Sequence, residues 1–318
     1  MKELMTKFKK AGGMDLVKQY IKAGVLFFAI TDILRLGTSQ KALEILRLSV
    51  QFKIQKKLKK KYSYVINRLD EEKPNSIIHK QSNKVWICWF QGINNAPQLV
   101  KRCYESLKEN LKDREIIIIT SENILEYVVF PDYILEKYKS GVITKTHFSD
   151  FLRLELLIKY GGLWIDATVL CTSSNIPKYI YNSDLFVYQI LKPGQDGQSQ
   201  LISSWLMSAC SNNKILLATR AMLYEYWKNN NSILDYYLLH TFFAIACEQY
   251  PDEWNIVVKQ PNSIPHILLL ELFDKYNEEE FERVKAMTCF HKLSYKHDKK
   301  LIEKRGTYYD MIISLYNH

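Results

Sequence analysis

Residues 150–168, DFLRLELLIKYGGLWIDAT, decide the fold prediction for this chain. Ser149 is placed to cap a helix that begins at Asp150, and the glycine pair at 161–162 ends that helix. The residues that follow, 163–166, form a short strand that ends in Asp166. A helix that leads through two glycines into a strand is a building unit of α/β domains.

Three charged side chains of this unit are expected to converge. Asp150 and Arg153 lie one turn apart on the same face of the predicted helix. On the strand, Trp164 and Asp166 point to one side because side chains alternate. Asp166 also ends the strand, and open α/β sheets bind ligands at the carboxyl ends of their strands.

The region before this unit predicts the start of a parallel sheet. Residues 84–92, KVWICWFQG, indicate a strand and then a loop, residues 98–111 a helix, and residues 115–120, EIIIIT, a fully buried strand. Strand, helix and strand at this spacing imply a parallel βαβ unit. Further helices are expected around 215–229, 234–249 and 278–286.

Composition limits the remaining possibilities. The chain has 318 residues, 47% of them apolar and 25% charged, which suits one large core with or without a satellite segment. Its six cysteines form no CxxC pair and fit a reducing cytoplasm. The most apolar early stretch, 25–30, is far shorter than the ~20 residues of a spanning helix, so we expect no membrane crossing.

The basic charge belongs to the N-terminal segment. Residues 1–68 hold 16 Lys+Arg against 4 Asp+Glu, whereas the other 250 residues hold 28 against 30. Here an apolar stripe with lysines crowded at its C-terminal end predicts a basic amphipathic helix, with Leu43, Leu46, Val50, Ile54 and Leu58 as the stripe. One interpretation is that this helix packs its apolar stripe on the core and solvates its lysines; the other is that it lies on an anionic membrane surface, and the two are compatible. Nucleic-acid binding is disfavoured because no binding motif accompanies the lysines.

The unit at 150–168 resembles the capsular polysaccharide synthesis glycosyltransferases, relatives of glycosyltransferase family 32 and of the glucosylating clostridial toxins. The resemblance covers most of residues 80–300. It implies a GT-A type, Rossmann-like nucleotide-sugar-binding α/β domain at 80–318, preceded by the basic helical segment at 1–70. It also implies a UDP-sugar donor and transfer of a hexose with retention at the anomeric carbon.

The same resemblance assigns candidate site residues. Asp150 and Arg153 would hydrogen-bond hydroxyls of the donor sugar, and Asp166 would reach the ribose or the metal-bound diphosphate, so these three are the expected catalytic residues. The first strand would bind the base and ribose, with Trp86, Trp89 and Gln91 as candidates.

One departure from the resemblance concerns the metal. The wider superfamily has DxD where this chain has Asp166, Ala167 and Thr168, and a threonine hydroxyl is a poor ligand for Mg²⁺ or Mn²⁺. If a divalent metal binds, it needs a ligand elsewhere, and His291 in FHKLSYK is the candidate beside Asp166.

Two further sets of polar residues are candidates. Lys292 and Lys296 resemble a diphosphate-binding segment, and negative charge on the leaving diphosphate needs such cations; alternatively they are solvated surface charge. Asp235 and His240 are candidates for acceptor binding, although an isolated histidine on an apolar helix usually packs in the core.

The predicted function is transfer of a hexose from a UDP-sugar to a lipid-linked saccharide in bacterial capsular or surface polysaccharide synthesis. The protein would lie in the cytoplasm, peripheral to the inner face of the cell membrane, without nucleic acid. The alternative is a non-catalytic saccharide- or nucleotide-sugar-binding protein with a degraded DxD motif. A further alternative is that the helix, the two glycines and Asp166 are ordinary parts of an α/β fold and have no role in binding or catalysis.

Overall fold

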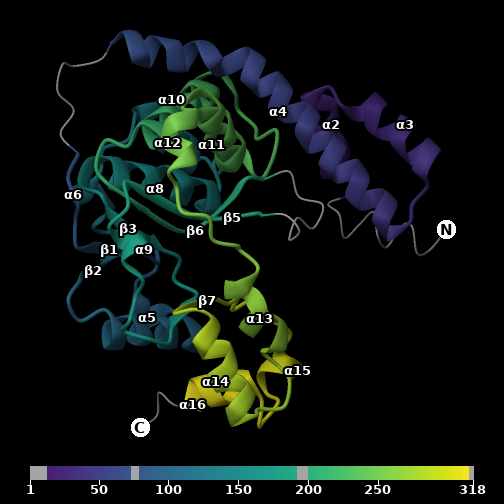
Figure 1. The fold of residues 1–318 in the computed structure, drawn as a ribbon. Coiled ribbons are helices and arrows are strands. Elements are labelled where there is room, and N and C mark those ends of the chain that lie inside the picture. Colours follow the sequence, from purple (N-terminus) through teal and green to yellow (C-terminus); the bar gives the residue numbers. More distant parts are fainter. Residues whose placement is uncertain (1–12, 73–78, 192–199, 315–318) are drawn as a thin grey trace.

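The computed structural model describes residues 13–72, 79–191 and 200–314. Its centre is a five-stranded sheet in the order β2-β1-β3-β6-β5 (Figure 1). The strands are β1 (Lys84–Cys88), β2 (Glu115–Ile119), β3 (Gly162–Ile165), β5 (Leu185–Gln189) and β6 (Ile202–Ala209). β1 runs parallel to β2 and β3, and β6 runs antiparallel to β3 and β5. The predicted α/β class and the parallel βαβ unit are confirmed.

The helices up to residue 255 are α2 (Gly13–Ala23), α3 (Leu26–Leu36), α4 (Gln40–Glu71), α5 (Gln98–Asn110), α6 (Ile124–Tyr127), α7 (Asp132–Lys139), α8 (Lys145–Tyr160), α9 (Lys178–Tyr181), α10 (Lys214–Asn229), α11 (Leu238–Gln249) and α12 (Pro251–Asn255). Of these, α8, α10 and α11 pack on one face of the sheet, and α5 and α9 pack on the other. Nearer the C-terminus follow α13 (Ile267–Glu271), α14 (Glu278–Met287), α15 (Lys299–Ile302) and α16 (Tyr308–Ser314). A two-stranded sheet pairs β4 (Val169–Cys171) with β7 (Phe290–Lys292).

Side-chain alternation on β3 divides the core into two layers. Trp164 belongs to the cluster formed with α4, α8, α10 and α11, and Leu163 and Ile165 belong to the cluster formed with α5 and α9 on the other face. This is the alternation expected from the sequence. β2 differs from expectation, because it is an edge strand with Glu115 exposed and only Ile119 fully buried.

The helix that leads into β3 begins earlier than predicted. α8 starts at Lys145, and its N-cap is Thr144, whose side chain accepts a hydrogen bond from the backbone N–H of His147. The predicted cap, Ser149, lies inside the helix, because the polar run at 144–150 offers more than one capping residue. The predicted end is right: Gly161 caps the helix with φ of 68°, in the left-handed region that favours glycine.

The basic N-terminal helix is confirmed and is longer than expected. α4 has 32 residues and lies across α10 and α11 (Figure 1). Leu46, Val50, Ile54 and Leu58 are buried in the cluster that α4 shares with α10 and α11, so the stripe does pack on the core. None of the helices in the described ranges is both long and apolar enough to span a bilayer.

Candidate active site

A cavity of about 530 Å³ opens where β1 and β3 end, and we call it the strand-end cavity. From β1 the chain passes through α5 to β2 on one side, and it returns to β3 on the other side of β1. The crevice between β1 and β3 is therefore the point at which the strand order reverses, where open α/β sheets bind ligands. Residues that follow both strands line the cavity, as the sequence predicted.

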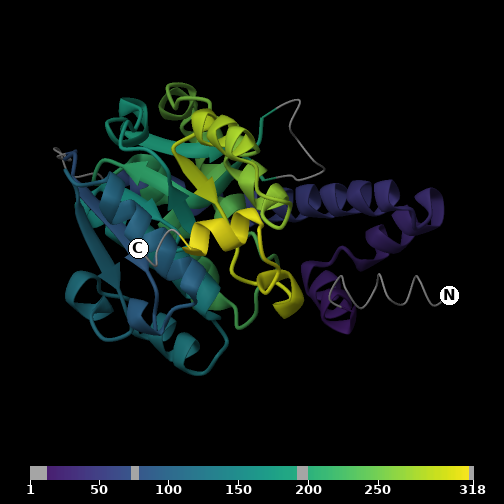
Figure 2. The ribbon, with the colours of Figure 1, turned by 90° about the horizontal axis from the view of Figure 1, so that it is seen from below.

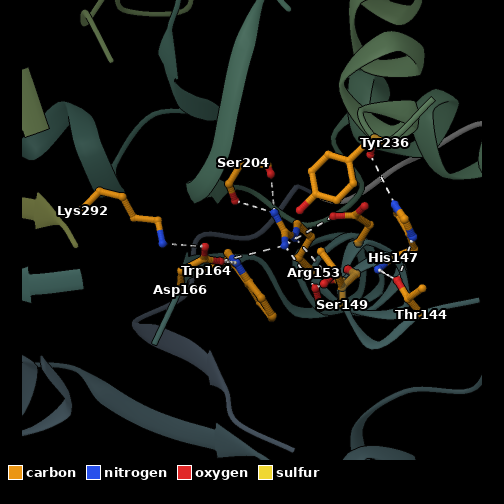
Figure 3. A network of polar contacts seen from close by, with 11 residues as sticks. Thr144, His147, Ser149, Arg153, Trp164, Asp166, Ser204, Tyr236 and Lys292 are labelled. Atoms are coloured by element: carbon orange, nitrogen blue, oxygen red, sulfur yellow. Dashed lines mark hydrogen bonds and ion pairs between the residues drawn. The ribbon is translucent and has the colours of Figure 1, made fainter. Parts of the chain in front are cut away.

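Asp166, which follows β3, is the centre of a charged network (Figure 3). Its Oδ2 lies 3.2 Å from Lys292 Nζ, and its Oδ1 lies 3.9 Å from Arg153 Nη2. Trp164 Nε1 donates to Asp166 Oδ1 at 3.2 Å. The network holds the carboxylate at the cavity wall with its side chain still 30% exposed.

Arg153 is fixed almost completely by the protein. Its Nη1 donates to the backbone carbonyl of Ser204 at 2.7 Å and also to the hydroxyl of Ser204, and its Nη2 donates to Ser149 Oγ at 3.3 Å. The guanidinium also lies 5.1 Å from the ring centroid of Trp164. A guanidinium held on several sides keeps its orientation, which suits the binding of a polar ligand.

Asp150 lies one turn before Arg153 on α8, and its Oδ1 is 3.4 Å from Arg153 Nη2. Burial raises the pKa of Asp150 to about 6, with Arg153 acting in the opposite direction and Asp166 adding to the rise. The structure thus brings Asp150, Arg153 and Asp166 together, as expected. Asp150 itself does not contribute to the lining of the strand-end cavity.

The aromatic wall of the cavity comes from segments far apart in the sequence. Trp89, which follows β1, and Tyr295, which follows β7, contact edge to face with ring centroids 5.4 Å apart. Gln91 lines the same wall. The indole Nε1 of Trp89 is buried without a hydrogen-bond partner among the described residues, so it is a donor that a ligand in the cavity can satisfy.

Trp86 was expected in the donor site, and the structure places it elsewhere. It is fully buried in the core below the sheet, and its Nε1 donates to the backbone carbonyl of Gly161 at 2.9 Å. Trp86 points to the same face of β1 as Cys88, but it lies two residues further from the end of the strand, and the cavity reaches β1 only at Cys88. Trp86 therefore joins β1 to the end of α8.

His291 was expected to share a metal with Asp166, but it faces away from the cavity. It is fully buried on β7, and its Nε2 lies 3.0 Å from Thr172 Oγ1. Its neighbour Lys292 alternates to the other side and reaches the cavity instead. Burial lowers the pKa of His291 to about 4, so the ring is neutral near pH 7.

The residues around Asp166 do not fit a divalent cation. Lys292 Nζ, already paired with Asp166, also donates to Thr168 Oγ1 at 2.5 Å, so an ammonium occupies the oxygens of the Asp-Ala-Thr triplet. Over 13–72, 79–191 and 200–314, no three His, Cys, Asp or Glu side chains come close enough to hold a metal together. A hard cation needs several oxygen ligands, and here one carboxylate faces two protein cations.

The two acceptor candidates lie beside the cavity rather than in it. Asp235 is buried, accepts from the backbone N–H of Tyr237 through Oδ1, and has an Oδ2 without a partner among the described residues. Burial lowers the pKa of His240 to about 3. The positive charge of Arg153 lowers this pKa further, and the negative charge of Asp166 raises it. His240 is therefore a neutral ring close to the charged network.

Lys296 lines the cavity as predicted, and the sequence reasoning missed several of its neighbours. Tyr236 and Tyr295 stand inside segments already singled out, DYYLLH and FHKLSYK, where only charged and histidine side chains were chosen. Ser204 has no sequence signal, because its role is to hold Arg153 from β6. Among the missed residues that line the cavity or support it are Lys145, Thr146, Ser149, Ser204, Tyr236, His266 and Tyr295.

The fold and this cavity define an α/β protein with a charged cavity at the switch point of its sheet. The chain belongs to the family described as capsular polysaccharide synthesis protein, whose model matches residues 38–312.

Similar proteins carry related names. The O-glycosyltransferase PaGT of Phomopsis amygdali is 27% identical over 165 residues, which cover 46% of this chain and 39% of that protein. The O-glycosyltransferase braB of Annulohypoxylon truncatum is 32% identical over 92 residues, which cover 26% of this chain and 22% of that protein. The chain thus spans less than half the length of these curated relatives.

Among solved structures, the PaToxG glycosyltransferase has 15% sequence identity and a TM-score of 0.37, covering 82% of this chain and 96% of that one. The family and the names of the relatives support glycosyltransferase activity in general. The relatives named here are fungal, and their names specify no nucleotide donor, lipid acceptor or stereochemistry.

Proposed function

We propose that this chain is a glycosyltransferase that binds a nucleoside-diphosphate sugar, a UDP-sugar, in the strand-end cavity. The observation that carries the proposal is the meeting of Arg153, Asp166 and Lys292 at the carboxyl ends of β1 and β3. Trp89 and Tyr295 offer aromatic surface for the base, and the charged network offers contacts to ribose, sugar and phosphates.

In this proposal the work of the site is positioning and stabilisation of the leaving group. The bond between the anomeric carbon and the diphosphate oxygen breaks, and a bond from the acceptor hydroxyl oxygen forms. The acceptor attacks on the face that the diphosphate leaves, and its proton passes to the departing diphosphate, which gives retention. Lys292 and Lys296 lie where positive charge offsets the charge developing on that group.

The acceptor side of the proposal is a lipid-linked saccharide at the inner face of a bacterial cell membrane. The family description supports a polysaccharide product. The basic helix α4 supports a membrane surface as the place of work, since lysines are attracted to anionic lipid. The transferred sugar is proposed as a hexose, such as glucose or galactose.

Asp166→Ala tests the proposal. Loss of this carboxylate removes an acceptor for hydroxyls of the donor and the group that positions Lys292 and Arg153, and we expect UDP-sugar hydrolysis to fall by about 100-fold or more. Calorimetry should show UDP affinity weaker by about tenfold. Asp113→Ala, which changes an exposed carboxylate far from the cavity, is the matched control. Normal turnover in Asp166→Ala would sink the assignment.

A non-catalytic sugar-binding protein is the second candidate, and Thr168 in place of a second carboxylate favours it. It predicts that purified protein binds UDP-sugar but does not cleave any member of a nucleotide-sugar panel. Transfer or hydrolysis with any donor decides against it.

A further inference from the structure

Two helices of the N-terminal segment leave apolar stripes uncovered. On α3, Phe27, Ile30 and Leu34 are 80%, 46% and 80% exposed. On α4, exposed Ile45, Leu48 and Phe52 repeat the same spacing of three and then four residues. This spacing places each set on one face of its helix. Large exposed apolar residues elsewhere in the described chain are scattered.

The stripes are not the faces that hold the helices in place. Ala29 of α3 and Leu46 and Val50 of α4 are buried in the main core cluster, and Lys57 ties the α2–α3 turn to α4 by donating to the carbonyls of Ala23 and Gly24 at 2.7 and 2.8 Å. Figure 2 shows the three helices extending to one side of the sheet domain. The folded chain therefore presents these apolar faces outward on a fixed support.

The charge around the stripes indicates what covers them. Residues 13–61 carry 11 Lys+Arg against 3 Asp+Glu. Two copies of so basic a surface repel each other, whereas an anionic lipid surface attracts it and accepts the apolar side chains between the headgroups. Lysines of α4 stand beside both helices, because Lys53 Nζ lies 4.0 Å from the ring centroid of Phe28 on α3 and Lys56 Nζ lies 4.6 Å from that of Phe52. Exposed Phe, Ile and Leu next to basic side chains are the pattern of a helix that lies in a membrane interface.

The same helices are joined to the strand-end cavity. Gln19 on α2 donates through Nε2 to the backbone carbonyl of Leu234 at 2.7 Å. Two residues later, Tyr236 lines the cavity, and its carbonyl lies 3.3 Å from His147 Nε2 on α8. A surface fixed by α2–α4 is thus fixed relative to one wall of the cavity.

We propose that the exposed faces of α3 and α4 insert into the interface of an anionic phospholipid bilayer, and that Gln19 and the loop at 234–236 hold the strand-end cavity beside that surface. The inference assigns membrane binding to apolar side chains as well as to lysines. Its acceptor side rests on the proposed function, because a lipid-linked saccharide would then reach the cavity from the bilayer.

The test compares two triple variants of the full chain. Phe27→Ser, Ile30→Ser and Leu34→Ser together remove the α3 stripe, whereas Leu125→Ser, Val129→Ser and Ile256→Ser remove apolar residues of comparable exposure elsewhere. Sedimentation with phosphatidylcholine vesicles, with and without phosphatidylglycerol, measures binding. We expect the α3 variant to bind anionic vesicles about tenfold more weakly or worse, with the control variant unchanged.

Vesicle binding at high salt concentration distinguishes insertion of apolar side chains from electrostatic attraction alone. At about 1 M NaCl surface attraction is screened, so inserted apolar residues should retain part of the wild-type binding. The proposal would be overturned if wild-type vesicle binding were lost completely at high salt, or if the two variants bound anionic vesicles equally well. A wild-type dimer that the α3 variant dissociates without any change in vesicle binding would also overturn it. Donor hydrolysis in solution is measured in parallel: its absence from the wild type refutes the proposed function and leaves the vesicle result standing.

Discussion

At the scale of residues, Asp150 is a carboxyl group that the fold makes difficult to ionise. Burial raises its pKa to about 6, against an ordinary value of ~3.9. A raised pKa means that the folded state favours the protonated form, so the stability linked to Asp150 is complete below about pH 4 and is lost as pH rises through about 6.

Asp150→Asn should therefore change the pH dependence of stability. Asparagine stays neutral, so relative to wild type the variant should gain up to about 3 kcal/mol in free energy of unfolding between pH 4 and pH 8. Urea denaturation at several pH values measures this gain, with exposed Asp113→Asn as the control. If the difference in free energy of unfolding between Asp150→Asn and wild type were the same at every pH, Asp150 would not titrate in this way.

Lys292 supplies the second prediction at this scale. Because it bonds both Asp166 and Thr168, we expect UDP binding to persist in EDTA and Lys292→Ala to weaken it by about tenfold. Lys299→Ala, which alters a lysine whose side chain is 88% exposed, should leave affinity unchanged. Calorimetry that detects UDP binding only after Mn²⁺ is added would contradict this expectation.

The sequence allowed the convergence of Asp150, Arg153 and Asp166 to be predicted although the start of α8 was placed wrongly. A spacing of three residues puts two side chains on one helix face wherever the helix begins. His291 and Lys292 show the opposite case, because which of two neighbours faces a cavity depends on the register of β7 against β4. That register comes from a contact between segments more than a hundred residues apart, and no local pattern reports it.

At the scale of elements, the turn between α8 and β3 tolerates little change. Gly162 has φ of 98°, and a Cβ there would lie 2.4 Å from the backbone carbonyl oxygen of Lys84. Gly162→Ala must therefore separate β1 from β3, and we expect a loss of about 3 kcal/mol or more in free energy of unfolding.

Gly141→Ala is the matched control for that variant. Gly141 has φ of 77° but open space where a Cβ would stand, so only backbone strain of about 1 kcal/mol is expected. Thermal or urea unfolding compares the two. Equal losses in free energy of unfolding for the two variants would show that the backbone adjusts to the close contact with Lys84 without a loss of stability.

At the scale of the whole molecule, the N-terminal segment is part of the core rather than an appendage. The family match begins at residue 38, and buried Val50, Ile54 and Leu58 share one cluster with α10 and α11. Deleting residues 1–60 should therefore lower the melting temperature by more than about 5 °C and expose apolar surface to a dye such as ANS. An unchanged melting temperature would show that α4 adds no stability.

The α/β class, the βαβ unit and the basic helix could all be predicted because each depends on local periodicity. The antiparallel positions of β5 and β6 and the small β4–β7 sheet could not, because they depend on pairings between distant segments. For the same reason the cavity was predicted at the right strand ends, while one wall, built by Tyr236 and Tyr295, was missed.

The ammonium group of Lys292 at the Asp-Ala-Thr triplet supplies positive charge from the chain itself, where a metal ion would have to come from the surrounding solution. The occupancy of a site by a dissociable cation depends on the free cation concentration relative to the dissociation constant, and cellular chelators such as citrate or nucleotides compete for that cation. A covalently attached cation is present once per molecule under every growth condition. On the proposed function, polysaccharide synthesis through this site would follow the availability of sugar donor and would not respond to manganese starvation.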